Sequence, residues 1–279
     1  MGLPEIFISF QTAAVSAITR SARGVLAVAV KDATAGGAAE AAYKSLTEVP
    51  EDKFSPENYR LLKLAFLAAP TKVWVLRVGE DAEKTYQALE RLRFDWLVVA
   101  NATAPDCEGI VNLCVSGLTL EDGAMEAKDY AVRVAALLAA LPLTRSATYV
   151  NLPEVVGCDA LAEPDEAVDA GKLIIVPGRE GYRLGRAVNS LTTLTPDKAA
   201  PFQKIKIVEG IDLIRGDIAK AFESGYVGKV LNDYDNKLLL VTAINAYLKG
   251  LEGDVLDKTA DNRCFVSLSG QRSYLESRG

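Results

Sequence analysis

Between residues 25 and 100, short apolar runs alternate with helical patterns, and this alternation limits the possible folds more than any other feature of the chain. Residues 25–30 are an unbroken apolar run, as in a buried central strand. Two further strands are predicted over 72–78 and 96–100, with a helix before each of them. This order predicts an α/β (or α+β) fold whose mixed-sheet core is flanked by helices.

Local patterns place the helices of this first half. Ser55 and Pro56 predict a helix start, because serine can cap the first turn and proline is tolerated within it. An exposed helix is expected over 81–93, and an alanine-rich helix over 126–141. The second of these has a stripe of large apolar residues beside a stripe of small ones, which predicts a helix buried in the core. The large residues are Tyr130, Val134, Leu137 and Leu141, and the small ones are Ala131, Ala135 and Ala139.

The second half of the chain predicts a β-hairpin followed by two helices. Strands are expected over 172–176 and 182–194 around a turn at 178–181, with a further short strand over 205–208. A polar loop at 226–236, ending in residues that cap helices, separates the two helices that follow. The apolar residues of these helices are Ile211, Ile214, Ile218 and Phe222 in the first, and Leu240, Ile244, Tyr247, Leu248 and Leu251 in the second.

Composition argues against several classes of protein. The chain has 279 residues and a net charge of −6, with acidic and basic residues interspersed, so neither DNA nor RNA is an expected partner. The first residues form no secretory signal, and the longest apolar-leaning stretch, 131–143, is too short to span a bilayer. We therefore expect a chain made and kept in a cytoplasm, without direct membrane insertion and with its four cysteines reduced.

The sequence contains no complete pattern for catalysis or ligand binding. The chain has no histidine, which excludes a Ser-His-Asp triad, a Cys-His pair and histidine-bound zinc. The glycines of 178–185 fit a hairpin turn rather than a phosphate loop, because no helix is predicted after them. Asp233, Asp235 and Asn236 lack the glycine and glutamate of a calcium loop, and no base accompanies the hydroxyl groups of 190–195. We expect no catalytic residue, cofactor or metal.

The N-terminal residues predict an extended arm in addition to the α/β core. The arm consists of Pro4, Glu5, Ile6, Phe7, Ile8, Ser9 and Phe10. Alternation places Ile6, Ile8 and Phe10 on one apolar face of an extended strand. Such a strand is either an edge strand of its own domain or an arm that adds to the sheet of a neighbouring subunit.

Several segments resemble those of one known family, in the same order along the chain. They are residues 2–10, 14–24, 141–149 (Leu-Pro-Leu-Thr-Arg-Ser-Ala-Thr-Tyr), 152–155, 188–195 (Val-Asn-Ser-Leu-Thr-Thr-Leu-Thr), 209–218 and 226–237. Together they resemble contractile tail sheath proteins, which occur in bacteriophages with contractile tails and in R-type bacteriocins. The chain is most similar to the short type found in Gram-positive phages, and the resemblance covers most of its length.

The resemblance implies a structural, non-enzymatic subunit of a contractile injection system. Its implied partners are itself, in hexameric rings stacked helically, together with the tail tube protein, the baseplate and the tail terminator proteins. It implies that contraction releases energy stored during assembly and drives the tube through a target envelope, with no nucleotide consumed. The implied location is a virion tail or phage-tail-like particle, assembled in the bacterial cytoplasm.

The resemblance also implies a division of the chain into three segments. Residues 1–20 are the linking arm, 21–145 an α/β domain, and 146–279 the sheath core C-terminal domain. The family uses a helix of its C-terminal domain to contact the tube, and 236–251 is the candidate for that helix.

Two departures from the family pattern stand out. A further helix and strand are expected between Ala100 and Cys107, and family members continue past the position of Gly279 into a C-terminal arm. Either the protein is a shortened variant or the sequence omits these segments.

Two other interpretations stay open at this point. A histidine-free α/β enzyme or small-molecule binding domain fits the same order of strands and helices. It requires a pocket that holds a carboxylate or lysine with a strongly displaced pKa. A soluble domain that self-associates without contracting requires residues 4–10 to fold back on their own chain.

The arm generates a first testable prediction. Replacing Ile6 and Ile8 by lysine charges the apolar face of the arm, so the subunit is expected to fold normally but to lose polymer formation. Circular dichroism measures folding, and electron microscopy measures polymers. Unchanged polymers would remove the arm from the assembly hypothesis.

Overall fold

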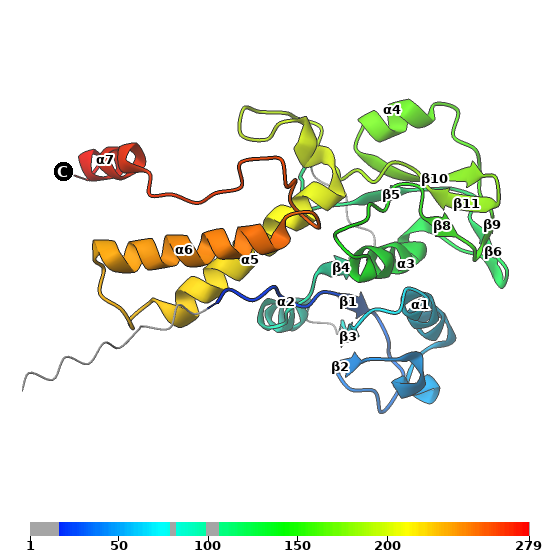
Figure 1. The fold of residues 1–279 in the computed structure, drawn as a ribbon. Helices are drawn as coiled ribbons and strands as arrows, with labels where there is room; N and C mark the ends of the chain where they lie inside the picture. Colours follow the sequence, from blue (N-terminus) through cyan, green and yellow to red (C-terminus); the bar gives the residue numbers. More distant parts are fainter. Residues whose placement is uncertain (1–16, 79–81, 99–105, 279) are drawn as a thin grey trace, which may run out of the picture. The chain divides into compact units, whose positions relative to one another are not determined.

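The computed structural model describes residues 17–78, 82–98 and 106–278 (Figure 1). By its internal contacts the chain divides into two compact units. The larger unit spans residues 22–211, and the smaller one contains the residues before 22 and those from 212 onward. The division into arm, α/β domain and C-terminal domain concerns function rather than contacts, and it stays a prediction. Within the described residues, no helix is both long and apolar enough to cross a membrane.

The first sheet of the larger unit has the strand order β2-β3-β1-β4. The central strand β1 (Val25–Val30) is parallel to β3 (Lys72–Arg77) and to β4 (Trp96–Val98). At the edge, β2 (Glu40–Tyr43) is antiparallel to β3. The predicted mixed sheet is confirmed, and β2 is an addition, because its alanine-rich sequence carries little strand signal.

Helices cover both faces of this sheet. Successive side chains of β1 point to opposite faces, so Leu26 and Val28 lie in one buried cluster with residues of α1 (Pro56–Phe66), and Ala27 lies in another. The second cluster contains the buried apolar residues of α2 (Ala82–Arg91). These residues of α2 are Ala88 and Leu89, so this helix is only partly exposed.

A buried ion pair holds the loop after β1. The carboxylate of Asp32 accepts hydrogen bonds from the N–H groups of Ser55 and Thr34, from the amide of Asn58, and from Arg77 at 3.2 Å. Burial by itself raises the pKa of Asp32, but these hydrogen bonds outweigh it and hold the pKa well below its ordinary value. The side chain of Ser55 also accepts a hydrogen bond from the N–H of Asn58, which confirms the predicted helix cap.

The second sheet has the order β5-β10-β11-β8. Strand β10 (Lys172–Gly178) is parallel to β5 (Asn112–Cys114) and antiparallel to β11 (Gly181–Leu184), which in turn pairs with β8 (Asn151–Leu152). The predicted hairpin is therefore confirmed. A small third sheet has the order β7 (Gly123–Ala124), β6 (Thr119–Leu120), β9 (Val155–Gly157). The short helix α4 (Pro164–Asp169) completes this part.

The predicted strand 182–194 is wrong beyond Leu184. The next residue, Gly185, lies so close to β10 that a Cβ atom there would be 2.7 Å from Cγ1 of Ile174. The chain then leaves the sheet, and the threonines that follow pair with no strand in the described part of the chain. Threonine favours a strand only where neighbouring strands pack against it.

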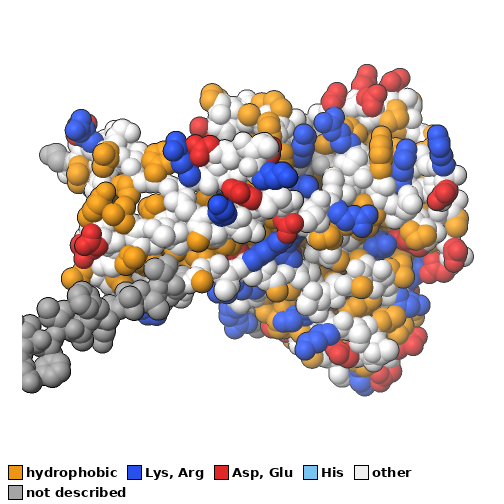
Figure 2. Space-filling model, viewed as in Figure 1, with side chains coloured by type: hydrophobic (Ala, Val, Ile, Leu, Met, Phe, Trp, Pro, Cys, Tyr) orange, Lys and Arg blue, Asp and Glu red, His pale blue; other side chains and the backbone are white. Residues whose placement is uncertain are grey.

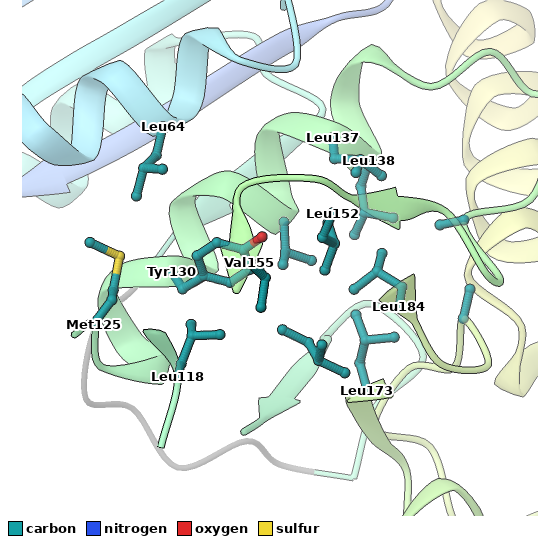
Figure 3. Packing of buried hydrophobic residues seen from close by; sticks show 14 of the residues in the cluster. Leu64, Leu118, Met125, Tyr130, Leu137, Leu138, Leu152, Val155, Leu173 and Leu184 are labelled. Atoms are coloured by element: carbon teal, nitrogen blue, oxygen red, sulfur yellow. The ribbon is translucent and has the colours of Figure 1, made fainter. Parts of the chain in front are cut away.

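Helix α3 (Ala127–Ala140) lies between two hydrophobic clusters. One of its faces, with Tyr130 and Leu138, packs into the cluster of the second sheet (Figure 3). The opposite face, with Ala135 and Ala136, packs into the cluster of the first sheet and α1. The predicted buried core helix is confirmed, and the small residues mark the side that faces the first sheet.

Three helices follow the second sheet: α5 (Ile205–Gly225), α6 (Tyr234–Leu251) and α7 (Leu268–Glu276). The predicted strand 205–208 is wrong, because it is the first turn of α5. Its β-branched residues favour a strand locally, but Ile205 and Val208 lie one helical turn apart and are both buried. Short single-turn helices lie at Leu46–Glu48, Glu51–Lys53 and Ala200–Gln203.

The position of α3 predicts a large cost for a cavity in it. Leu138→Ala is expected to lower the free energy of unfolding by about 2–5 kcal/mol, because it removes buried methyl groups and leaves a void. Urea unfolding followed by circular dichroism measures this loss. The control Leu67→Ala, at a residue that is 56% exposed, is expected to change the free energy of unfolding by less than about 0.5 kcal/mol. Equal effects of the two substitutions would contradict the central role of α3.

Candidate assembly surface

The loop between α5 and α6 ends in a helix cap. The side chain of Asp233 accepts a hydrogen bond from the N–H of Asn236 at 2.8 Å, and the Asn236 amide donates to the carbonyl of Leu231 at 3.0 Å. These contacts confirm helix capping at the positions that resemble a calcium loop. The described part of the chain contains no group of three or more acidic or cysteine residues that could hold a metal ion.

Helix α6 is buried along only half of its length. Ala243, Ile244, Tyr247 and Leu251 form its buried stripe, at helical spacing. The first half, residues 234–242, has no buried residue although its sequence is largely apolar. In this half Tyr234 and Leu238 are exposed, whereas Leu239, Leu240 and Val241 are half-buried. Large apolar side chains left in solvent indicate a contact surface for another chain.

A buried carboxylate ties the residues before 22 to both helices. Asp217, on α5, is only 3% exposed. Its carboxylate accepts hydrogen bonds from Ser21, from the backbone N–H at 3.2 Å and from the side-chain hydroxyl at 2.5 Å. It also accepts a hydrogen bond from the hydroxyl of Tyr247 on α6 at 2.6 Å. Burial, together with the bond to Asp217, raises the pKa of Tyr247, so the phenol stays a donor. Arg20 adds an ion pair with Asp254 at 3.6 Å, so the segment that leads out of the predicted arm is fastened at its base.

Apolar side chains in contact with solvent gather where α5 and α6 are joined, and we call this the hairpin-end surface. It consists of the exposed residues Phe222, Val227, Val230, Leu231, Tyr234 and Leu238, together with the half-buried Tyr226. Leu231 is 77% exposed, and the rings of Phe222 and Tyr226 stack with centroids 6.2 Å apart. Figure 2 shows hydrophobic side chains over this end of the two helices.

The C-terminal residues are attached to α6 through Asn245. Its side-chain amide donates to the carbonyl of Cys264 at 3.0 Å and accepts from the N–H of the same residue at 2.6 Å. Three residues further on, Ser267 caps α7 by accepting a hydrogen bond from the N–H of Gly270. Helix α7 has no buried residue.

Exposed apolar residues lie on α7 and just before it, and we call them the α7 stripe. It consists of Phe265, Leu268 and Leu275. Leu268 is 74% exposed, and the other two are also well exposed. The smaller unit therefore presents two separate apolar surfaces to solvent.

The buried carboxylate of Glu209, in the larger unit, is hydrogen-bonded by residues of the same chain. Burial raises the pKa of Glu209, an effect that Arg23 and Trp96 partly oppose by hydrogen bonding to its carboxylate. This acid does not line the hollow of about 250 Å³ in the larger unit. Two polar residues that do line the hollow, Asn189 and Gln203, donate to backbone carbonyls. The arrangement fits structural roles for these groups.

The hydroxyl-rich and glycine-rich segments also have structural roles. The N–H groups of Thr192 and Thr193 donate to the carboxylate of Asp106, at 2.7 and 3.0 Å. Hydrogen bonds from Thr193 and Thr192 lower the pKa of Asp106 to about 2. The glycines of 178–185 form the turn and the end of the β10–β11 hairpin, as predicted. The four cysteines, all within the described residues, are free thiols.

The predicted arm, residues 4–10, lies outside the described residues, so its role stays a prediction. The same holds for most of the shortened segment between Ala100 and Cys107. The predicted tube-contacting segment, 236–251, forms most of α6.

Sequence reasoning missed the Asp217 anchor and both apolar surfaces. One signal was present: Asp217 lies on the same face of α5 as the apolar residues Leu213, Ile214 and Ala221, where an acid needs a buried partner. Its partners could not be inferred from sequence, since Ser21 is 196 residues away.

Exposed apolar surfaces on a folded unit mark sites of association, so these features describe a chain that assembles with other chains. The family model for the phage tail sheath C-terminal domain matches residues 197–261. The chain is 32% identical to the tail sheath protein of Clostridium phage phiCD119 over 323 aligned positions, which cover 99% of this chain and 88% of the relative. The chain belongs to the tail sheath protein family, and it is a structural subunit of a contractile tail sheath.

Solved structures show that the fold is shared. The crystal structure of the sheath tail protein from Desulfitobacterium hafniense has a TM-score of 0.71 at 15% identity, covering 88% of this chain and 89% of that one. The helical sheath of the anti-feeding prophage in its contracted state has a TM-score of 0.63 at 14% identity, covering 90% and 84%. The predicted fold class is confirmed.

The hydrogen bonds of Asp217 generate a prediction in which this buried acid behaves differently from an exposed acid of the same unit. Asp217→Asn weakens the three hydrogen bonds of the carboxylate, and it is expected to lower the free energy of unfolding by about 1.5–3 kcal/mol. It is also expected to speed cleavage by trypsin after Arg20, because the segment that contains this residue is released. Asp235→Asn, at an exposed position of α6, is the matched control. Cleavage at the wild-type rate in Asp217→Asn would contradict the anchoring role.

Proposed function

We propose that this chain polymerises as hexameric rings, stacked helically around a tail tube, and that the sheath contracts to drive the tube through a target cell envelope. The relation to a tail sheath protein over nearly the whole chain carries this proposal. One matched structure is the contracted helical sheath of the anti-feeding prophage, and another is its baseplate. The proposed partners are other copies of this chain, a tail tube protein, the baseplate and the tail terminator proteins.

The N-terminal arm is proposed to link neighbouring subunits. Ile6, Ile8 and Phe10 supply an apolar face, and backbone hydrogen bonds to a neighbour's sheet supply affinity. The Asp217 anchor supports this role, because a pull on the arm is passed to α5 and α6 rather than to a loose chain. In this view residues 1–20 act as the linker, 21–145 as the α/β domain, and 146–279 as the sheath core.

Helix α6 is the proposed contact with the tube, through the exposed side of residues 236–251. The subunit itself is proposed to be non-enzymatic, because the work of contraction comes from energy stored during assembly. Assembly takes place in the bacterial cytoplasm, and the finished sheath is part of a virion tail or a phage-tail-like particle. Neither nucleic acid nor a membrane is a direct partner.

Negative-stain electron microscopy of the full chain, alone and together with its tube protein, tests the proposal. Hollow tubes or rings of uniform width and six-fold symmetry are expected. Only small dispersed particles under both conditions would contradict polymerisation. Tubes that form but stay at one length after a contraction trigger such as urea or acid would contradict contraction.

A further inference from the structure

The first and last residues of the larger unit meet in one cluster of largely buried charge. This unit spans residues 22–211, so Arg23 and Glu209 lie close to its two ends. Nη2 of Arg23 donates a hydrogen bond to Oε1 of Glu209 at 2.5 Å, and the two side chains are 15% and 14% exposed. Asp95, just before β4, contacts the same guanidinium group, with its Oδ1 atom 3.8 Å from Nε. Two carboxylates therefore share one cation.

The same cluster holds the residues that lead into β1. Oδ2 of Asp95 accepts hydrogen bonds from the N–H groups of Gly24 and Val25, each at 2.8 Å. The backbone carbonyl of Arg23 accepts another, from the hydroxyl of Thr71 at 2.9 Å. The state of the cluster therefore affects how firmly the larger unit holds residues 22–25.

The charges within the cluster do not balance. Asp95 and Glu209 carry two negative charges when ionised, whereas Arg23 supplies one positive charge. The remaining donor to Glu209 is Nε1 of Trp96, at 2.9 Å, and it is neutral. Excess negative charge in a largely buried cluster favours the uptake of one proton.

Other charged residues nearby in the chain do not supply the missing positive charge. Arg93 and Asp212 are exposed, where solvent weakens their effect, and their charges are opposite. Nζ of Lys206, one helical turn before Glu209 on α5, donates to a backbone carbonyl at 3.3 Å. Lys72 lies over a tryptophan ring of its own strand, with Nζ 5.2 Å from the ring centroid.

Glu209 is the acid of this cluster that can take up a proton without losing a contact. Arg23 and Trp96 both donate to Oε1, and in the described part of the chain Oε2 accepts no hydrogen bond. A proton on Oε2 therefore leaves both hydrogen bonds in place. Burial raises the pKa of Glu209 and the charge of Asp95 raises it further, whereas Arg23 and Trp96 oppose these effects.

The direction of this pKa shift decides the effect of pH. Because the pKa of Glu209 is higher in the folded unit than in the unfolded chain, the folded unit binds the proton more tightly. The contribution of Glu209 to stability is therefore present at low pH, and it is lost as the pH rises through the folded-state pKa. This is opposite to the usual behaviour of an ion-paired carboxylate.

We propose that Arg23, Asp95 and Glu209 form a proton-sensitive lock, in which uptake of one proton by Glu209 tightens the hold of the larger unit on residues 22–25. With Glu209 neutral, Arg23 is matched by Asp95 alone, the acid that binds the N–H groups of Gly24 and Val25. The lock lies within the larger unit, so it does not depend on the proposed polymerisation. It acts on the chain that continues from Ser21 and the predicted arm.

The composition of the chain makes the titration of Glu209 observable. With no histidine in the sequence, no side chain with an ordinary pKa changes charge between about pH 5 and 7. The chain has two tryptophans, so Trp74→Phe leaves Trp96, a direct partner of Glu209, as the only one. The fluorescence of Trp96 in this variant is expected to change with pH, with a midpoint above the ordinary glutamate pKa of 4.5. Adding Glu209→Gln is expected to abolish the change.

Two further substitutions in the Trp74→Phe background are expected to move the midpoint in opposite directions. Asp95→Asn keeps an acceptor for the backbone N–H groups but removes a negative charge, so the midpoint is expected to fall. Arg23→Met removes the cation, so the midpoint is expected to rise. Glu166→Gln, at an exposed position of α4, is the matched control and is expected to leave it unchanged. A midpoint at or below 4.5, or a change that persists in Glu209→Gln, would overturn the inference.

Hydrogen exchange measured by mass spectrometry on the full chain tests the tightening itself. After correction for the intrinsic pH dependence of exchange, residues 22–25 are expected to be better protected below the midpoint of Glu209 than above it. The gain is expected to reach up to about tenfold for each pH unit by which the midpoint exceeds the ordinary value. In Glu209→Gln the protection is expected to be high and independent of pH. Equal protection of the wild type on both sides of the midpoint would show that protonation does not tighten the segment, and the lock would be wrong.

Discussion

The burial of α3 on both sides holds the larger unit together. One face of this helix fills the core of the second sheet, and the opposite face fills the core between the first sheet and α1. A helix that is buried all round cannot shift toward one sheet without opening a void at the other. Alanine on one side and larger residues on the other set the distance to each sheet. Both sheets therefore pack against the same helix, although no strand of one sheet pairs with a strand of the other within the described residues.

The smaller unit, in contrast, buries few of its residues. Its few buried groups are concentrated at the Asp217 anchor and along half of α6, and much of its apolar surface is left in solvent. For an isolated protein this pattern is a liability, because exposed apolar surface promotes association. For a subunit of a tail sheath, association is the function. The anchor ties Ser21, which follows the predicted arm, to two helices, while the hairpin end and α7 stay exposed to solvent.

Much of the larger unit could be predicted from local pattern. The run 25–30, the Ser55 cap and the stripes of 126–141 each specify an element through residues within a few turns of one another, and each element formed as predicted. Prediction failed where distant packing outweighed local preference. Residues 205–208 prefer a strand by composition, yet the burial of Ile205 and Val208 against the core makes them helical. The arm, where sequence made its strongest claim about assembly, lies outside the described residues.

The order, periodicity and composition of the chain were enough to predict the fold class and to exclude histidine chemistry, and the resemblance of several segments indicated the family. They were not enough to establish which apolar residues are left uncovered. Periodicity does not separate the buried Ile244 from the exposed Phe222, since each lies on the predicted apolar stripe of its helix. The physical reason is that exposure depends on what packs against a residue from elsewhere in the chain. Ser21 and Asp217, 196 residues apart, meet only because the folded chain brings them together.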